Sequence, residues 1–111
     1  MEASMEDISK WMPLYIGDYL ANTIGLTHSQ HGAYLLSIFK YWQKGESLTS
    51  DELREVAGRE VNRVAQFYVW EGNRWHHKRI DQELERARKN VLAKAERGKK
   101  GAQARWGTAV A

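Results

Sequence analysis

The 111-residue sequence contains no cysteine and a single proline. The absence of cysteine excludes a disulfide framework and any thiolate metal site, and it fits the reducing cytoplasm, where we expect the protein to act. Long apolar runs are also missing. Residues 21–39 carry no charge, but their asparagine, threonine, glutamine and histidine side chains make them too polar to span a membrane. The acidic N-terminus has no apolar core region, so we expect no signal peptide.

The motifs on which catalysis depends are missing as well. The sequence has no glycine-rich phosphate loop, no serine nucleophile elbow and no carboxylate pair at a spacing that predicts a shared site. His28 and His31 are one helical turn apart, but His76 and His77 are neighbours whose side chains would point to opposite faces of a strand. Without cysteine, these histidines do not predict a metal site. We therefore expect a binding protein that is not an enzyme, with no cofactor and no metal.

Residues 28–44 form the most clearly marked helix. Thr27 and Gln30 have the spacing of a capping box, and Gly45 can take the left-handed conformation that ends a helix. Small and polar residues make one narrow stripe along this helix, and apolar residues cover the rest. The stripe consists of Ser29, Ala33, Ser37, Lys40 and Lys44. A helix with so little polar surface is expected to be the core helix, surrounded by the other elements.

Shorter elements are predicted on both sides of this helix. Residues 1–10 are expected to be a flexible lead-in, residues 11–16 an extended edge segment, and Asp18 the cap of a helical turn over residues 19–21. Residues 46–48 are long enough only for a one-pair bridge. A second capping box, Thr49 and Glu52, begins a helix over residues 50–57, and a further helical pattern spans residues 59–67. Gly72 and Asn73, between two aromatic-rich runs, predict a tight hairpin turn of type II′ or I′.

An apolar seam with helical spacing follows the hairpin. It predicts a charged helix over residues 80–97 that lies on the body or pairs with another copy of the chain. The residues of a possible homodimer seam are Ile80, Leu84, Ala87 and Val91, with Ala95 continuing the pattern. Residues 98–111 show no core pattern and are expected to be a basic, mobile tail. The predicted fold is mainly α with a small β-hairpin: a winged helix-turn-helix-like domain over residues 11–79, then a long basic C-terminal helix and the tail.

Positive charge is concentrated at the C-terminal end. Residues 1–77 carry 7 Lys and Arg against 10 Asp and Glu, whereas residues 78–111 carry 10 against 4, so charges of −3 and +6 make up the total of +3. A basic segment on a small protein is typical of nucleic-acid binding through neutralised phosphates, and a tryptophan can stack on an unpaired base. The candidate contacts here are Lys78, Arg86, Arg88, Lys89, Lys94, Arg97, Lys99, Lys100, Arg105 and Trp106.

The helix-turn-helix pattern supplies a second set of candidates. Arg59, Asn62, Arg63 and Gln66 lie on the polar side of the third predicted helix, where these side-chain types could reach phosphates and base edges, and Arg74 lies in the predicted wing. The alternative is that this is only a solvated face, since the body is acidic. The basic segment likewise has an alternative role, as a solubilising tail or one that folds on a protein partner.

Five stretches of the sequence share a pattern with a known family. They are Trp11 to Leu20, Leu26 to Leu36 with its His-Gly-Ala-Tyr-Leu-Leu block, Tyr41 to Gly45, Trp75 to Leu84, and Gly98 to Trp106. Together they resemble the YdaU-like family of phage and prophage proteins, a domain of unknown function. The resemblance implies a winged-helix-like fold, similar to the N-terminal domains of some phage replication initiators, and no enzyme activity. Residues 53–67 are shorter than the family's usual pattern, which reduces the expected recognition helix.

The leading hypothesis is a small phage-type DNA-binding protein associated with DNA replication in the cytoplasm of a bacterial host. Duplex or single-stranded DNA is then the main partner, bound chiefly by the basic C-terminal segment. The alternative is an accessory protein that binds a host or phage protein, for instance a replication helicase or a defence complex, as an adaptor or inhibitor.

Overall fold

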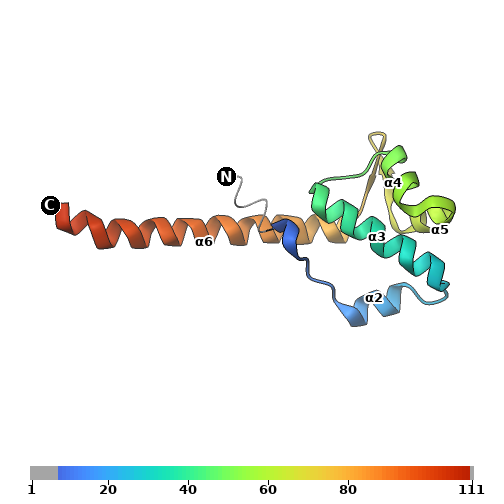
Figure 1. The fold of residues 1–111 in the computed structure, drawn as a ribbon, viewed down its shortest axis with the longest axis horizontal. Coiled ribbons are helices and arrows are strands. Elements are labelled where there is room, and N and C mark those ends of the chain that lie inside the picture. The colour runs from blue at the N-terminus through green and yellow to red at the C-terminus, as the bar shows by residue number, and fades with distance from the viewer. Residues whose placement is uncertain (1–7, 111) are drawn as a thin grey trace.

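The computed structural model describes residues 8–110, with side chains described as far as Gly98. Figure 1 shows short elements gathered into a body, and one long helix that extends away from it. After a helical turn at residues 8–10, the elements are α2 (Ile16–Asn22), α3 (His28–Lys44), α4 (Ser50–Ala57), η1 (Gly58–Glu60), α5 (Val61–Val64), η2 (Ala65–Phe67), β1 (Val69–Glu71), β2 (Arg74–His76) and α6 (Lys78–Val110). The described fold is mainly helical with a small hairpin, as the sequence predicts.

Helix α3 begins and ends where the sequence predicts. The Gln30 N–H donates to Thr27 Oγ1 at 3.1 Å, and the Thr27 N–H donates to Gln30 Oε1 at 2.9 Å, so the capping box is complete. At the other end, Gly45 has a φ of 79°, and its N–H donates to the Tyr41 carbonyl. This left-handed residue ends the helix because it satisfies a carbonyl of the last turn.

The middle of the stripe of small and polar residues on α3 faces the core, whereas Ser29 and Lys40 of the same stripe are exposed, so the interpretation of the stripe as polar surface holds only for part of it. Ser37 is fully buried, and its hydroxyl bonds the Tyr34 carbonyl at 2.6 Å and the Tyr68 hydroxyl at 2.7 Å. Ala33, one turn earlier on the same stripe, is also buried. Small side chains let neighbouring elements approach the helix closely. Ala33 and Ser37 therefore pack into the core, while Leu36 and Phe39 remain exposed.

Helix α4 is confirmed, but the helix predicted over residues 59–67 is not continuous. Thr49 and Glu52 form the second capping box, and Leu53 on α4 is fully buried. After Gly58 the chain makes η1, the four-residue α5 and η2 instead of one regular helix. The side of this segment opposite the predicted polar side does pack inward, since Val64 is buried and Val61 and Ala65 pack against the core.

The hairpin turns at Gly72 and Asn73, with φ values of 59° and 60°. Two consecutive residues with positive φ define a type I′ turn, one of the two types predicted. Val69 pairs with His76 and Glu71 with Arg74 across the antiparallel strands. The predicted one-pair bridge also forms, because the Leu48 and Trp75 backbones exchange hydrogen bonds of 3.0 and 2.7 Å.

The N-terminal segment is more closely packed than the sequence predicts. Ile8 is buried, and its carbonyl accepts a hydrogen bond from Trp42 Nε1 at 2.6 Å, so the end of the predicted flexible lead-in is held against α3. Residues 1–7 lie outside the described residues. Helix α2 begins at Ile16, and Asp18 lies inside its first turn with no capping role, which corrects the predicted cap. Asp18 instead forms an ion pair with Arg79 at 2.7 Å.

The core lies between α3, α4, the hairpin and the first turns of α6. Its largest fully buried side chains include Tyr41, Leu48, Leu53 and Leu84. Helix α6 begins at Lys78, two residues before the predicted start, and its backbone stays helical to Val110 instead of ending at Arg97. Alanine, lysine, arginine and glutamine are strong helix formers, and the segment has no proline, so its glycines do not end the helix. The predicted basic tail therefore has a helical backbone as far as Val110.

Candidate nucleic-acid interface

Helix α6 has an anchored first part and an exposed second part. Ile80 and Leu84 are buried in the core, and Ala87 and Val91 pack against it, whereas residues 92–98 are all exposed. Ile80 and Leu84 are therefore occupied by the chain's own body, which agrees with the first of the two predicted alternatives, a seam that lies on the body. With 33 residues, α6 is about 50 Å long, so most of its second half extends beyond the body (Figure 1).

The basic residues of α6 near the body hold structural contacts. Arg86 pairs with Glu83 at 3.3 Å and Lys89 with Glu85 at 3.1 Å. Arg88 donates from Nη2 to the Gly45 carbonyl at 2.6 Å, which joins α6 to the end of α3. The Lys89–Glu85 pair is solvent-exposed and costs little to open, because exposed ion pairs contribute roughly 0–1 kcal/mol, whereas the Glu83 side chain that holds Arg86 is only 12% exposed.

Lys78, Lys94 and Arg97 have exposed side chains that make no hydrogen bond or ion pair with any residue whose side chain the structure describes. Lys94 and Arg97 lie on the part of α6 that leaves the body. Such unpaired cations are free to meet phosphates without first losing an internal partner. Of the other candidates, Lys99, Lys100, Arg105 and Trp106 lie outside the described side chains, although their backbone belongs to α6.

A groove runs beside the basic part of α6. Its volume is about 940 Å³, and it separates residues 8–15 and Trp42 from one side of α6. We call it the Trp11 groove, because the Trp11 side chain on its wall is 72% exposed. The basic residues that line the groove are Lys10, Arg86 and Lys94. Its acidic residue is Glu83, which pairs with Arg86. Sequence reasoning missed Lys10, which lies in the segment expected to be flexible, and Trp11, which begins the apolar segment expected to be extended; the signal was a tryptophan next to a lysine.

The candidates on the helix-turn-helix face do not form one ridge. Arg59, Asn62 and Gln66 are exposed, but they are distributed over η1, α5 and η2. Arg63 donates to Gln66 Oε1, and its guanidinium lies 5.7 Å from the centre of the Phe67 ring. A recognition helix normally presents its contacts along one continuous face. The broken segment brings these four residues near one another without that geometry.

Arg74, the candidate in the hairpin, is held by the body. Its guanidinium donates to Ser47 Oγ and to the Ser47 carbonyl at 2.7 Å each, and to Glu46 at 2.9 Å. These bonds attach β2 to the segment after α3. Arg74 is thus a structural residue of the hairpin, and a nucleic acid would have to compete with all three contacts.

His77, considered from the sequence only as a possible metal ligand, caps α6. Its Nδ1 accepts the Ile80 N–H at 3.3 Å, and its Nε2 lies 2.9 Å from the Tyr34 hydroxyl. Tyr41 accepts the His77 N–H at 3.1 Å and donates to Asp81 at 2.5 Å. Burial lowers the pKa of His77 to about 4, so its ring is neutral at pH 7. This cluster fixes the start, and hence the direction, of α6.

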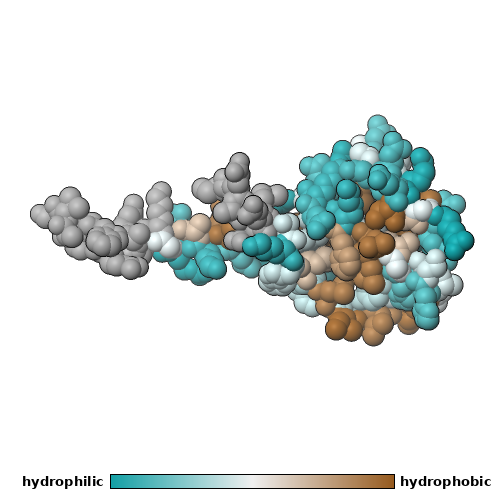
Figure 2. Space-filling model, viewed as in Figure 1, coloured by the Kyte–Doolittle hydropathy of each residue, from teal (hydrophilic) through white to brown (hydrophobic). Residues whose placement is uncertain are grey.

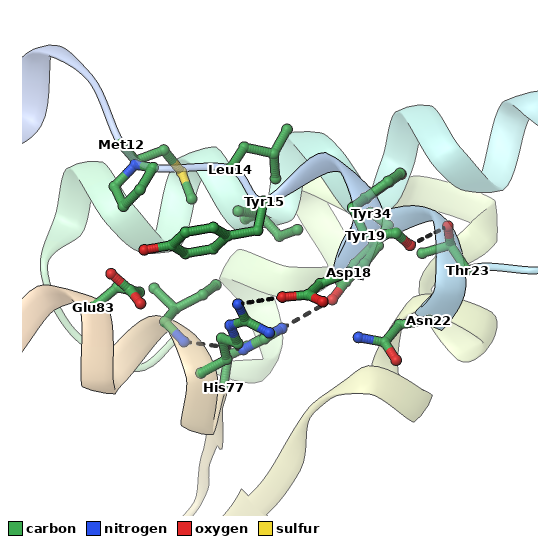
Figure 3. Close-up of a pocket in the computed structure, with 14 residues that line it drawn as sticks. Met12, Leu14, Tyr15, Asp18, Tyr19, Asn22, Thr23, Tyr34, His77 and Glu83 are labelled. Carbon is green, nitrogen blue, oxygen red and sulfur yellow. Dashed lines mark hydrogen bonds and ion pairs between the residues drawn. The ribbon is translucent and has the colours of Figure 1, made fainter.

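A small pocket lies next to this cluster. Figure 3 shows Tyr15, Asp18 and His77 along it, with residues 12–15 on one side. Its volume is about 80 Å³, which is room for a few water molecules and too little for a nucleotide. Asp18 and His77 are already bonded to Arg79 and Tyr34. The pocket is therefore not a candidate nucleic-acid interface; the candidate residues lie on α6 and around the Trp11 groove.

The histidines and carboxylates of the body are dispersed. Among the side chains that the structure describes, no three of them are grouped so that they could hold a metal ion. Within the same part of the chain, no helix combines the length and apolarity needed to cross a membrane.

Comparison with known proteins places the chain in a family. The model for the family described as "Protein of unknown function (DUF1376)" matches residues 10–85. The chain belongs to this family. A curated relative, "Uncharacterized protein YdaU" of Escherichia coli (strain K12), is 38% identical over 102 residues, which cover 86% of this chain. The chain spans about a third (36%) of the length of that relative. No solved structure matches.

The family region contains the body and the anchored start of α6. It ends one residue before Arg86, so Arg86, Lys94 and Arg97 lie beyond it. Lys10 and Trp11, on the opposite wall of the Trp11 groove, lie within it. The groove is therefore formed by family residues on one wall, and on the other mainly by the part of α6 that follows the matched region.

Proposed function

We propose that this chain is a DNA-binding protein of the phage or prophage type, in which a winged-helix-like body positions the basic second half of α6. The element order supports the winged-helix comparison: α3, the bridge at Leu48, α4, a third helical segment and the β1–β2 hairpin follow one another. Resemblance to phage replication initiators supports a role in DNA replication in the bacterial cytoplasm.

The single observation that carries the proposal is the Trp11 groove. Lys10 stands on one wall and Arg86 and Lys94 on the other, with the exposed Trp11 ring beside them. Cations that track a phosphate backbone, together with an aromatic ring on which a base can stack, are what sequence-tolerant single-strand binding requires. A duplex, whose bases are already stacked, would use the cations but not the ring. We therefore propose that single-stranded DNA is the preferred ligand.

The proposal is tested by fluorescence anisotropy with labelled single-stranded and duplex DNA of the same length and sequence. Binding is measured between about 50 and 200 mM salt, because the slope against salt counts the phosphates neutralised. The variant Lys10→Gln/Lys94→Gln removes one cation from each wall. Its single-strand slope should be smaller by roughly 1.4, at about 0.7 for each phosphate that is no longer neutralised. Arg54→Gln, which removes an exposed cation from α4, is the matched control and should leave the slope unchanged.

The stacking role of Trp11 is measured separately. Trp11→Ala should weaken single-strand binding roughly fivefold or more, because one base–aromatic stack contributes roughly 1–3 kcal/mol. It should change duplex binding much less. Trp70→Ala, on the exposed hairpin, is the control. Absence of binding at 50 mM salt, or equal effects of the two tryptophan substitutions, would reject the proposal.

A further inference from the structure

One side of the body carries an apolar patch that the proposed DNA interface does not use. Figure 2 shows hydrophobic surface over both α2 and α3 on the face turned to the viewer. We call this the α2–α3 patch, and define it by Ile16, Leu20 and Ile24 in and after α2 and by Leu36 and Phe39 on α3. Their exposed fractions are 69%, 58%, 81%, 55% and 42%. Five large apolar side chains gathered on one face are unusual for a surface that meets only water.

Helix α2 is incompletely packed within one chain. None of its residues is buried, and its inward contacts come from Tyr19, whose hydroxyl bonds His31 Nδ1 at 2.8 Å. Ile16 and Leu20, four residues apart on α2, lie on one side of this helix, and the exposed Ile24 follows in the turn after it. The exposed aliphatic side of α2 therefore has no packing partner among the described residues of the chain.

The patch lacks the charged side chains that ligands such as nucleic acid would require. From Tyr19 to Phe39 the sequence has no Lys, Arg, Asp or Glu, although 28% of the whole chain is charged. Nucleic acid needs cations, and the patch has none. A helix that lies in a lipid surface carries Lys or Arg on its polar side, whereas the charged residue of α2 is Asp18, which is paired with Arg79.

We propose that the α2–α3 patch is the interface of a two-fold homodimer. In such a dimer identical patches face each other, so a charged residue near the axis would meet its own like charge. Four of the five patch residues lie in the 21 uncharged residues from Tyr19 to Phe39, and Asp18, beside the fifth, is paired with Arg79, so this repulsion is small. The exposed aliphatic side of α2 can pack against the same side of the second copy, as ridges at steps of four do in crossed helix pairs.

The area of the patch gives the expected range of the dissociation constant of this dimer. The five exposed side chains present on the order of 500 Å² in each copy, so two copies would bury about 1,000 Å². This is near the lower limit for a specific interface, and we expect a dissociation constant in the micromolar range. The association should be nearly independent of salt, because it buries no charge. This distinguishes it from DNA binding, which should weaken strongly as salt rises.

The experiment is sedimentation equilibrium of the full chain from about 5 to 500 μM, at about 50 and 500 mM salt. The parent should form dimers at both salt concentrations. Leu20→Lys and Ile24→Lys should each weaken dimerisation more than tenfold, since they place like charges opposite each other. Both residues are exposed in the monomer, so circular dichroism and the midpoint of thermal unfolding should show an intact fold. Leu92→Lys, which alters a 58% exposed leucine on α6, adds the same charge and should change dimerisation less than twofold.

A second measurement uses the absence of cysteine from the chain. Leu20→Cys should form a disulfide-linked dimer under mild oxidation, whereas Leu92→Cys should remain monomeric. A parent that stays monomeric at 500 μM would overturn the proposal, including a monomer that binds vesicles of neutral phospholipid or another protein through the patch. A dimer that survives both lysine substitutions, or that Leu92→Lys abolishes, would also overturn it. None of these results depends on DNA binding, which is measured on its own.

Discussion

The contact between Lys44 and Glu52 joins the end of α3 to the beginning of α4. Glu52 Oε1 accepts from Lys44 Nζ at 2.5 Å and from the Thr49 N–H at 2.8 Å. Lys44 also donates to the Ser47 carbonyl at 3.1 Å. One carboxylate thus completes a capping box and pairs with the last basic residue of the preceding helix. We predict that Glu52→Gln, which keeps the shape of the side chain and its capping oxygen but removes the charge, destabilises the fold measurably at neutral pH.

The magnitude follows from the pKa of the Glu52 carboxyl. The hydrogen bond from Lys44, and next the one from the Thr49 N–H, lower this pKa from 4.5 to about 2. At 1.36 kcal/mol per pKa unit the charged form would contribute roughly 3 kcal/mol. The side chains of Glu52 and Lys44 are 26% and 23% exposed, so solvent screens part of this interaction. We therefore expect Glu52→Gln to lower the free energy of unfolding by about 1–2 kcal/mol at pH 7.

The pH dependence has a definite sign. The pKa of Glu52 is lower in the folded chain than in the unfolded one, so the unfolded chain takes up the proton first as the pH falls. The stabilisation is therefore complete above pH 4.5, and it is lost as the pH falls from 4.5 toward 2. The glutamine variant has no such contribution at any pH. The difference in unfolding free energy between parent and variant should shrink to a few tenths of a kcal/mol near pH 2.

The assay is urea unfolding followed by tryptophan fluorescence at several values between pH 7 and pH 2, with parent and variant compared at each pH. Urea is uncharged and does not screen the pair. Asp51→Asn is the matched control, because the Asp51 side chain is 92% exposed in its pair with Arg54, and its removal should cost less than about 0.5 kcal/mol. A parent–variant difference that stays constant from pH 7 to pH 2 would refute the assignment to charge.

Two further predictions concern the core and the cap of α6. Leu48→Ala should lower the unfolding free energy by roughly 2–5 kcal/mol in the same urea assay, because Leu48 is fully buried, whereas Leu36→Ala, at a 55% exposed position, should cost less than about 1 kcal/mol. His77 binds a proton less readily in the folded chain, with a pKa of about 4 against 6.5, so its contribution to stability should be complete above pH 6.5 and be lost as the pH falls toward 4. His77→Gln, which cannot take up that proton, should flatten the stability profile in this window, and an unchanged profile would contradict the assignment.

The sequence predicts those elements best that are specified by local contacts. Both capping boxes and the left-handed Gly45 are exchanges between residues no more than four apart, so their spacing alone locates α3 and α4. The hairpin turn is equally local, since Gly72 and Asn73 accept positive φ where other residues would be strained. The one-pair bridge at Leu48 was predictable because the segment is too short for more.

Features that depend on distant partners were predicted poorly. Ser37 was predicted on a solvent-facing stripe, because nothing in its own helix reveals that the Tyr68 hydroxyl, 31 residues away, satisfies it inside the core. The spacing of Ile80 and Leu84 does not show whether they pack against a second copy or against the body, since an apolar seam has the same period in both cases. Trp11 and Lys10 acquire their place in a groove only when α6 lies opposite them. The end of α6 was missed because glycine usually weakens a helix, whereas the strong helix formers between these glycines sustain it.

The contacts at the start of α6 explain why the basic C-terminal part of the sequence also lies apart from the body in the structure. Three contacts fix this helix in its first turns: the His77 cap, the Tyr41–Asp81 hydrogen bond, and the burial of Ile80 and Leu84. Because they act within one segment, the rest of the helix can continue outward without needing apolar residues of its own, and its surface is free to be basic. The described body, residues 8–77, carries seven basic and seven acidic residues, so the excess positive charge lies on α6. The α2–α3 patch lies on other elements than the basic part of α6, so the proposed DNA binding and the proposed dimerisation would use separate surfaces of one small chain.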